Sequence, residues 1–241
     1  MVIATSVFLS LLTWPHSHIS TAKPESSLEK KPDPSLLFIF GICGIAATIL
    51  VGTGEFLVHY TSTGYIGTEK FLWLKGIEPG RITAGHFLML TGMPLYLFGY
   101  GHLYLTIRPG SELLGRLLFV LGIFAFMTGG VWAGSRALLT EIVKADDQAL
   151  ILYYHNNYEV LVQVLRLLII LISIVWAYAI LKTKTLYPKW VAIFNPALVL
   201  GLVFLIYFTV PSVGKFLVPT AMNVTHFIVF SLSMATYAKR K

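Results

Sequence analysis

The sequence predicts an all-α membrane protein, a bundle of about six transmembrane helices preceded by a short apolar N-terminal segment. Only 12% of the 241 residues are charged, about half the share that is usual in soluble domains, and 56% are hydrophobic. The mean hydropathy is +0.76. The apolar runs are long and do not alternate between polar and apolar residues, so membrane-spanning strands are disfavoured.

The charge distribution points to a membrane and away from nucleic acid. The formal net charge is +7, but the basic residues lie in short connections and at the chain ends. In a membrane protein such residues set the topology and contact anionic lipid headgroups. The lipid bilayer is therefore the expected partner, and nucleic acid is not. The single Cys43 excludes an intramolecular disulfide.

The start of the chain is expected to lie outside the helical bundle. Residues 1–21 are apolar, but no basic residues precede their apolar stretch. They fit either a signal-like segment or a segment that lies in the membrane interface. Residues 22–35 are rich in proline, serine and charged side chains, which is typical of a linker. The transmembrane domain is then predicted to occupy residues 36–241.

Six apolar runs follow the linker, and each is long enough to cross a hydrocarbon core of about 30 Å as a helix. They occupy residues 36–60, 82–107, 113–139, 157–181, 189–210 and 215–238. Lysine and arginine are more frequent on the side where the first run begins. This bias places that side, with both termini, in the cytoplasm, and the expected location is a bacterial inner membrane.

Glycines recur every seven residues in the second and third runs. The two series are Gly85, Gly92 and Gly99, and Gly115, Gly122 and Gly129. Each series lines one helical face, and small residues let helices approach closely in lipid. We therefore expect the second and third helices to pack against each other, which would bring Trp132, Ser135 and Arg136 beside His86.

Prolines interrupt three of the runs and are expected to kink their helices. Pro94 falls in the second run, Pro196 in the fifth and Pro219 in the sixth. Each proline removes a backbone donor and leaves a carbonyl free for another partner. The connection from Thr61 to Gly80 is the longest in the bundle. Thr68 could cap a short helix there, which would act as an interfacial anchor, as a lid, or as both.

The fourth run carries the sharpest polar pattern. His155, Glu159, Gln163 and Arg166 follow at steps of four, four and three residues, so they fall on one helical face. Such a face cannot contact lipid and must face a cavity or another helix. Glu159 is expected to pair with Arg166 or with His155, because pairing lowers the cost of burying both groups.

Other helices place polar residues at a similar depth. Glu55 and His59 end the first helix, His86 begins the second, and Asn223 and His226 lie on the sixth. Charged and imidazole groups are costly inside a membrane, so their convergence in the extracytoplasmic half indicates a site. The exception is a histidine at the other end of the second helix, His102, which we expect to be interfacial.

A metal-dependent enzyme is one interpretation of this site. The candidate ligands for Zn, Fe or Cu are His59, His86, His155 and His226. A haem held by two of the last three is a further alternative. Glu55 or Glu159 would be a ligand or general base, and Arg136 or Arg166 would stabilise an anionic group. The candidate substrate-binding residues are Trp132, Ser135, Tyr154, Gln163 and Asn223. The enzyme would be a hydrolase or oxidoreductase acting on a lipid or another apolar substrate.

Other functions remain open at this point. The same residues could bind an ion or small molecule, or relay protons in a transporter. They could form a hydrogen-bonded network that fixes helix packing. They could also be completed by a membrane-protein partner, with this chain as an interaction subunit. The residue types and their spacing do not decide among these functions.

Three segments resemble a known group of proteins. They are YLFGYGHLYL at 96–105, FNPALVL at 194–200 and TAMNVTHFIVFSLS at 220–233. These segments are similar to those of an uncharacterised bacterial family of six-pass membrane proteins, and the similarity covers about half of the bundle. That family has no assigned activity, so the resemblance implies the fold alone.

Overall fold

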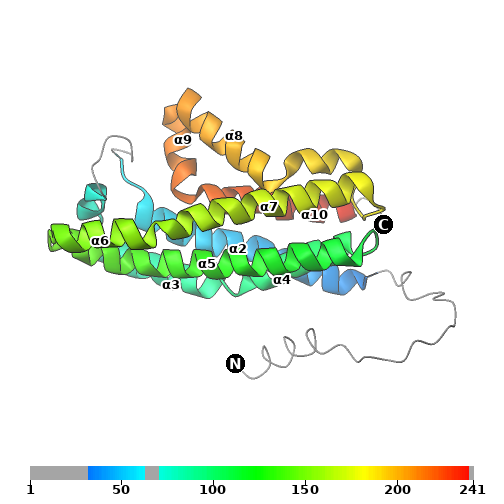
Figure 1. Cartoon of the computed structure of the whole chain (residues 1–241), viewed down its shortest axis with the longest axis horizontal. Coiled ribbons are helices and arrows are strands. Elements are labelled where there is room, and N and C mark those ends of the chain that lie inside the picture. Colours follow the sequence, from blue (N-terminus) through cyan, green and yellow to red (C-terminus); the bar gives the residue numbers. More distant parts are fainter. Residues whose placement is uncertain (1–31, 63–70, 239–241) are drawn as a thin grey trace, which may run out of the picture. The chain divides into compact units, whose positions relative to one another are not determined.

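The computed structural model describes residues 32–62 and 71–238. All regular structure within these residues is helical, and five helical stretches are long and apolar enough to cross a membrane (Figure 1). The prediction of an all-α membrane bundle is confirmed. The predictions for residues 1–21, and for most of the linker, fall outside the described residues.

The first described helix, α2 (Pro34–His59), forms the centre of the bundle. Asp33 caps it by accepting a hydrogen bond from the Ser35 backbone, and Pro34 fits the first turn, where no donor is needed. Helix α2 packs against α4 and α10, described below, as well as against its sequence neighbour. A helix with this many neighbours can carry buried polar groups such as Glu55 without exposing them to lipid.

The second span consists of two helices, α3 (Pro79–Gly92) and α4 (Leu95–Ile107). Helix α3 ends just before Pro94, whose ring cannot continue the backbone ladder, so the predicted interruption of the second helix is present. Together the two helices form one apolar stretch of 29 residues.

The predicted packing of the second and third helices is confirmed, and Gly115 and Gly122 of the third predicted run lie against α4. The glycines of the second span lie instead against α2. A Cβ on Gly85 would lie 2.7 Å from the Gly54 carbonyl, and one on Gly99 would lie 2.8 Å from the Cα atom of Gly44. The seven-residue spacing gave the correct face of the helix. It could not identify which neighbouring helix packs against that face, because small residues allow any neighbouring helix to approach closely.

The next two spans are α5 (Glu112–Lys144) and the pair α6 (Gln148–Tyr158) and α7 (Val160–Lys182). Ser111 and Asp147 cap the first helix of each span by accepting hydrogen bonds from backbone N–H groups. Helices α6 and α7 meet at Glu159 and together form an apolar stretch of 35 residues. Both spans begin or end several residues beyond the predicted limits of 113–139 and 157–181.

The last part of the bundle differs most from the sequence expectation. It contains the 3₁₀ turn η2 (Lys189–Phe194), α8 (Pro196–Thr209), α9 (Pro211–Leu217), the 3₁₀ turn η3 (Val218–Thr220) and α10 (Ala221–Ala238). Asn195 caps α8 and Pro196 begins it, so Pro196 starts a helix and does not kink one. With 14 residues, α8 is about 21 Å long, too short to cross the core alone.

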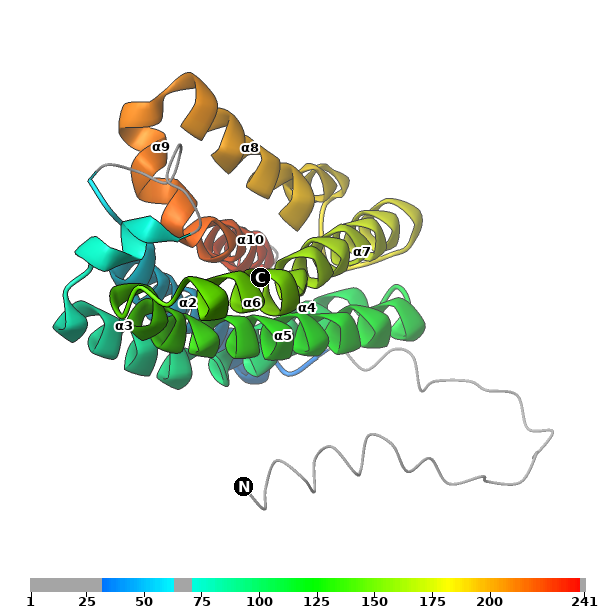
Figure 2. The same ribbon diagram turned by 60° about the vertical axis from the view of Figure 1, so that its left-hand side comes forward.

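Helix α8 leans away from the rest of the bundle. Its first turn is tied to α7 by a 2.8 Å hydrogen bond from the Ala197 backbone to Ser173. Beyond that point the two ribbons diverge, and α9 turns back toward α10 (Figure 2). The predicted sixth span therefore consists of α9, η3 and α10, with Pro219 in the irregular turn between the two helices.

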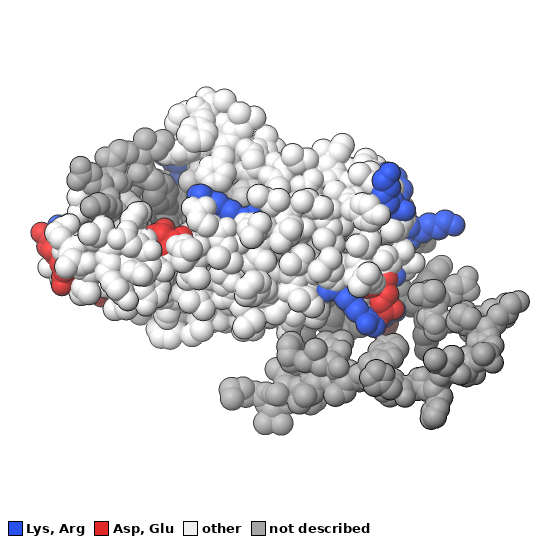
Figure 3. All heavy atoms as spheres, in the orientation of Figure 1, with Lys and Arg blue, Asp and Glu red and all other residues white. Residues whose placement is uncertain are grey.

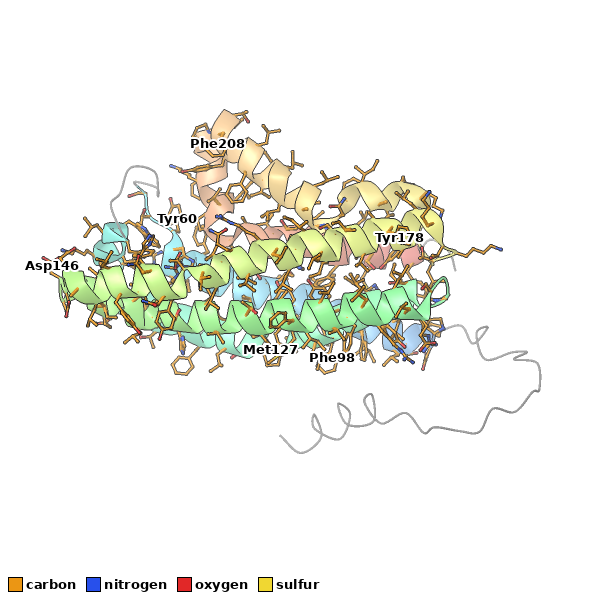
Figure 4. The ribbon with its side chains drawn as sticks, viewed as in Figure 1. Tyr60, Phe98, Met127, Asp146, Tyr178 and Phe208 are labelled. Carbon is orange, nitrogen blue, oxygen red and sulfur yellow. The ribbon has the colours of Figure 1, made fainter. Side chains whose placement is uncertain are left out.

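The outer surface of the bundle suits a lipid environment. On the face drawn in Figure 3, charged side chains gather mainly near the ends of the helical unit, apart from a basic patch between α7 and α9 and an acidic patch close to it. Large apolar side chains on several helices point outward, among them Met127, Tyr178 and Phe208, which are 58%, 56% and 71% exposed (Figure 4). In water such a surface would aggregate, whereas hydrocarbon accepts it.

A network of buried, hydrogen-bonded polar side chains joins the helices at the end of the bundle where α2 begins. His102 is fully buried, with Nδ1 2.9 Å from the Leu37 carbonyl and Nε2 2.6 Å from the Ser233 hydroxyl. Tyr187 joins Ser233 at 2.5 Å and Thr106 at 2.6 Å. The expected interfacial position of His102 was wrong. Since its groups are buried and partnered, the network holds α2, α4 and α10 together at this end.

The opposite end is covered by a short segment around η1 (Leu72–Gly76). Phe71 adopts a left-handed backbone conformation, and Leu74 is fully buried against residues of α5 and α6. The segment thus packs onto the bundle, and its role as an anchor or as a lid stays a prediction. The predicted cap at Thr68 lies outside the described residues.

Candidate functional site

A cavity of about 210 Å³ lies in the middle of the bundle. Six helices and the turn η3 line it, mostly with apolar side chains such as Met93, Leu165 and Leu200. Its polar lining residues are Glu55, Tyr96, Tyr100, Arg166, Asn223 and His226. We call this cavity the pocket. Apolar walls with a few converging polar groups are typical of sites for small ligands.

Glu55, Asn223 and Tyr96 form the inner wall of the pocket, on three different helices. The side-chain amide of Asn223 donates a 2.6 Å hydrogen bond to Glu55 and accepts one of 2.5 Å from the Tyr96 hydroxyl. All three residues are buried, and Glu55 is 9% exposed. Asn223 thereby uses its donor and its acceptor at once, which fixes the positions of both neighbours.

His226 forms the second polar element of the wall. Its Nδ1 atom is 2.8 Å from the Met222 carbonyl, and its Nε2 atom is 2.7 Å from the Tyr100 hydroxyl. A carbonyl can only accept, so in the neutral ring Nδ1 carries the proton and Nε2 accepts from Tyr100. This arrangement requires a glycine at position 122, because a Cβ there would overlap the Tyr100 ring.

A second polar group lies toward the end of the bundle covered by η1. Arg136 and Glu159 form an ion pair of 2.7 Å, with side chains that are 5% and 24% exposed. The Arg136 guanidinium lies 4.4 Å from the centre of the Trp132 ring and 5.2 Å from that of Phe71. We call Arg136, Glu159, Trp132, Phe71 and His59 the outer cluster. Aromatic faces and one carboxylate together stabilise the buried cation.

The outer cluster contains several polar atoms without a hydrogen-bond partner among the described residues. They are His59 Nε2, Trp132 Nε1 and two nitrogens of Arg136, Nε and Nη1. The His59 ring is 5.4 Å from the Trp132 ring and 5.8 Å from the Trp73 ring. Buried donors without partners are uncommon, so water or a ligand is expected to contact them when bound.

The predicted stripe on the fourth span is only partly buried. Glu159 contacts Arg136, so the expected pairing with Arg166 or His155 was wrong. The guanidinium of Arg166 is instead hydrogen-bonded to Gln163 at 3.3 Å, and both side chains are exposed. His155 is exposed and contacts the Phe71 ring. Because the helix is interrupted at Glu159, His155 lies on α6, whereas Gln163 and Arg166 lie on α7.

The four histidines predicted as metal ligands do not form a ligand set. No group of three or more His, Cys, Asp or Glu side chains suited to a metal ion occurs within residues 32–62 and 71–238. His226 is bonded to Tyr100, His59 lies beside Trp73 and Trp132, and His86 packs against Phe87. The prediction of a Zn, Fe or Cu site, and the haem alternative, therefore lack support from the geometry.

The residues predicted to bind substrate are divided between the two polar groups. Trp132 and Asn223 line the pocket. Ser135 and Tyr154 are hydrogen-bonded to each other at 2.5 Å beside the outer cluster. The predicted neighbour of Trp132 and Arg136 was His86, yet the ring beside Trp132 is that of His59. The lateral neighbours of these residues were therefore predicted incorrectly, and their depth in the membrane stays a prediction.

Sequence reasoning did not assign Tyr96 and Tyr100 to the site. They lie one helical turn apart on α4, and both line the pocket. A signal for them existed, since a tyrosine inside an apolar span needs a hydrogen-bond partner for its hydroxyl. Two such tyrosines on one face of a helix predict polar partners on a neighbouring helix, here Asn223 and His226.

Comparison with known protein families gives a match that covers almost all of the described residues. The family model of a family of unknown function, DUF6796, matches residues 35–240. The chain belongs to DUF6796. The resemblance to an uncharacterised family is thereby confirmed. No curated protein and no solved structure matches this DUF6796 chain.

Membership of DUF6796 brings no activity with it, because the family has no known function. The match includes every residue of the pocket and of the outer cluster. The chemistry of this DUF6796 protein must therefore be inferred from the site itself.

Proposed function

We propose that this protein binds one amphipathic, lipid-soluble small molecule inside the membrane, with the polar part of the ligand against the inner wall of the pocket. The observation that carries the proposal is the pocket itself, an apolar cavity in which Glu55, Asn223 and Tyr96 form a hydrogen-bonded wall. A buried carboxyl group beside a cavity is costly in a membrane, so a functional role is the expected reason for it.

Access from the lipid phase supports this proposal. Two residues that line the pocket are exposed, Arg166 on α7 and Phe204 on α8. The pocket therefore reaches the surface between these helices, in the direction in which α8 diverges from α7 (Figure 2). A ligand dissolved in the bilayer could enter sideways, without crossing the polar headgroup region.

Binding is a better fit to the site than metal-dependent catalysis. The predicted hydrolase or oxidoreductase needs several histidines around one ion, and these histidines lie in separate contacts. The inner wall offers one carboxyl, one amide, two phenols and one imidazole, which are groups that orient a ligand by hydrogen bonds.

We also propose that the protein crosses a bacterial inner membrane with both chain ends in the cytoplasm. Helical bundles are the expected form for that membrane, whereas outer membranes hold barrels. The start of α2 and the end of α10 lie at the same end of the helical unit (Figure 1). Basic residues are frequent there, namely Arg108, Arg116, Lys182, Lys184 and Lys189.

Native mass spectrometry of the full chain tests the binding function. We expect protein purified from membranes in mild detergent to carry one small molecule per chain. Gly129 lines the pocket, and a Cβ there meets its nearest neighbour at 3.8 Å, so Gly129→Phe would place its ring in the cavity. This variant should lose the bound mass.

A matched variant on the same helix serves as the control. No atom of the described residues lies within 4 Å of a Cβ added to Gly134, and Gly134 does not line the pocket, so Gly134→Phe adds the same ring outside it. This control should keep the bound mass. Wild-type protein without any bound molecule, after purification and after addition of a total membrane lipid extract, would contradict the proposed function.

A further inference from the structure

The mouth of the pocket carries a cation, Arg166, that has no ion-pair partner among the described residues. Arg166 lies on the membrane-spanning α7, lines the pocket and is exposed. Its hydrogen bond goes to the neutral side chain of Gln163, at 3.3 Å. None of the ion pairs among the described residues includes Arg166. A guanidinium within a membrane-spanning helix is costly unless something compensates its charge.

The acidic residue expected to balance Arg166 is engaged elsewhere. Glu159 lies seven residues earlier in the chain and forms its 2.7 Å ion pair with Arg136. On the other side of the pocket, Glu55 accepts a hydrogen bond from Asn223. The positive charge of Arg166 therefore faces the mouth of an apolar cavity and is available to a ligand.

A second donor reaches the same cavity from another helix. Trp132 on α5 lines the pocket, and its indole Nε1 is buried without a hydrogen-bond partner among the described residues. The indole N–H can only donate, as can the guanidinium of Arg166. The two groups with unused donors are thus complementary to a ligand that is rich in acceptors.

The surrounding walls define the rest of the ligand. Between these donors the pocket is lined by apolar side chains of α7 and α8, including Leu165, Ile169, Leu200 and Phe204. Such walls favour a hydrocarbon chain over a freely soluble anion. A guanidinium binds carboxylate and phosphate groups well, since its planar set of donors matches their oxygens.

We propose that the ligand of the pocket is an anionic amphiphile, a hydrocarbon chain with a carboxylate or phosphate headgroup, and that Arg166 binds this headgroup. The inference rests on the proposed binding function and adds the class of ligand. Arg166 holds the headgroup at the opening between α7 and α8, Trp132 donates to it from within the pocket, and the chain occupies the apolar cavity.

Titration with matched probes tests this inference. Palmitate, hexadecyl phosphate and hexadecanol have the same hydrocarbon chain and differ in the headgroup. They are added to the full chain in phosphatidylcholine nanodiscs, and occupancy is read by native mass spectrometry after release into detergent. We expect both anions to bind at least about ten-fold more tightly than the alcohol, because hydrogen bonds to charged groups are stronger than neutral ones.

Variants at Arg166 separate its charge from the shape of the pocket. Arg166→Gln should reduce the preference for the anions to near unity and leave the affinity for hexadecanol unchanged. Arg166→Lys should keep most of the preference, since it keeps the charge. Arg116→Gln is the control, because it removes a different membrane-helix arginine, one that is paired with Glu112 at 2.9 Å. It should behave like the wild type.

Each remaining outcome counts against a defined part of the account. Equal binding of acid and alcohol to the wild type, or an unchanged preference in Arg166→Gln, would overturn the anionic headgroup and leave the binding function intact. Displacement of palmitate by inorganic phosphate at equal concentration would assign the site to a free anion and overturn the amphiphile. Binding of none of the three probes would overturn the anionic amphiphile, whereas the binding function is contradicted only if the purified protein also carries no bound molecule.

Discussion

The carboxyl group of Glu55 accepts a 2.6 Å hydrogen bond from the side chain of Asn223, a residue 168 positions further along the chain. The same Asn223 accepts a 2.5 Å hydrogen bond from Tyr96. One amide thus joins α2, α4 and α10 at the depth of the pocket. It thereby fixes the position of the buried Glu55 carboxyl group relative to α4 and α10.

Replacement of this amide should destabilise the protein. Asn223→Leu keeps a similar volume but leaves Glu55 without this donor and Tyr96 without its acceptor. We expect a loss of about 1–2 kcal/mol in the free energy of unfolding, measured by denaturant titration in mixed micelles. Asn157→Leu, at an exposed position on α6, is the control and should be neutral. Equal stability of Asn223→Leu and the wild type would contradict the bridging role.

The approach of α4 to α5 depends on glycines of α5, and Gly122 makes the tightest of these contacts. A Cβ on Gly122 would overlap the ring of Tyr100, whose hydroxyl donates a hydrogen bond to His226. Gly122→Ala should therefore cost about 1–3 kcal/mol through overpacking. Gly134→Ala, on the same helix with open space around it, should raise stability by up to about 1 kcal/mol. Thermal unfolding of the two variants measures these changes. A change of stability in the same direction in both variants would contradict the proposed role of Gly122.

The buried network of His102, Ser233, Tyr187 and Thr106, at the end of the bundle where α2 begins, predicts that the free energy of unfolding depends on pH. Tyr187 lies in the connection between α7 and η2, and burial raises the pKa of its phenol above the usual value of 10.0. The folded state then holds this proton more tightly than the unfolded state. The resulting stabilisation is complete below pH 10 and is lost as the pH rises above it.

This effect is measured as a difference between two proteins. Tyr187→Phe removes the hydroxyl that contacts Ser233 and Thr106, so it should lower stability by about 1 kcal/mol near neutral pH. The advantage of the wild type should shrink as the pH rises through about 10–11. Tyr178→Phe, at a lipid-facing position that is 56% exposed, should show no such trend. A wild-type advantage that is constant with pH would disprove the assignment.

The two ion pairs of 2.7 Å should differ in energetic importance. Glu159→Gln leaves the buried Arg136 without its counter-charge and should cost about 2 kcal/mol. Asp146→Asn breaks the pair with Lys75, in which both side chains are largely exposed, and should have no measurable effect. Removal of both charges, in the double variant Arg136→Gln and Glu159→Gln, should recover part of the loss. Denaturant titration of these variants provides the comparison, and equal effects of the two single variants would contradict it.

The depth of the polar residues could be predicted from the sequence. A helix rises by a constant amount per residue, so the position of Glu55, Asn223 or His226 along its own span fixes its distance from the membrane surface. That calculation correctly placed Glu55 near Asn223 and placed Arg136 at the level of Glu159. The all-α membrane fold followed equally directly from the long apolar runs.

Lateral neighbours could not be predicted in the same way. The periodicity of Gly85 and Gly99 defines a face of the helix, and the partner of that face depends on how the helices are arranged around the bundle axis. Glu159 likewise had three possible basic partners, and the choice of Arg136 depends on the packing of α5 against α7. A single sequence holds no direct record of that arrangement.

The short α8 could have been recognised more accurately. Asn195 followed by Pro196 is a helix start signal, because the asparagine caps the helix and the proline fits its first turn. Reading the apolar run at 189–210 as one helix overlooked this signal. The oversight matters for the proposed function, in which the ligand enters between α7 and the short, diverging α8.

The most direct test of the central claim is photo-crosslinking in native membranes. A photoreactive residue replaces either Leu200, which lines the pocket, or Leu202, which is 52% exposed on the same helix. The account predicts that position 200 captures one discrete small molecule and that position 202 captures the bulk phospholipids. Capture of the same phospholipid mixture at both positions would show that the pocket is merely part of the lipid-facing surface.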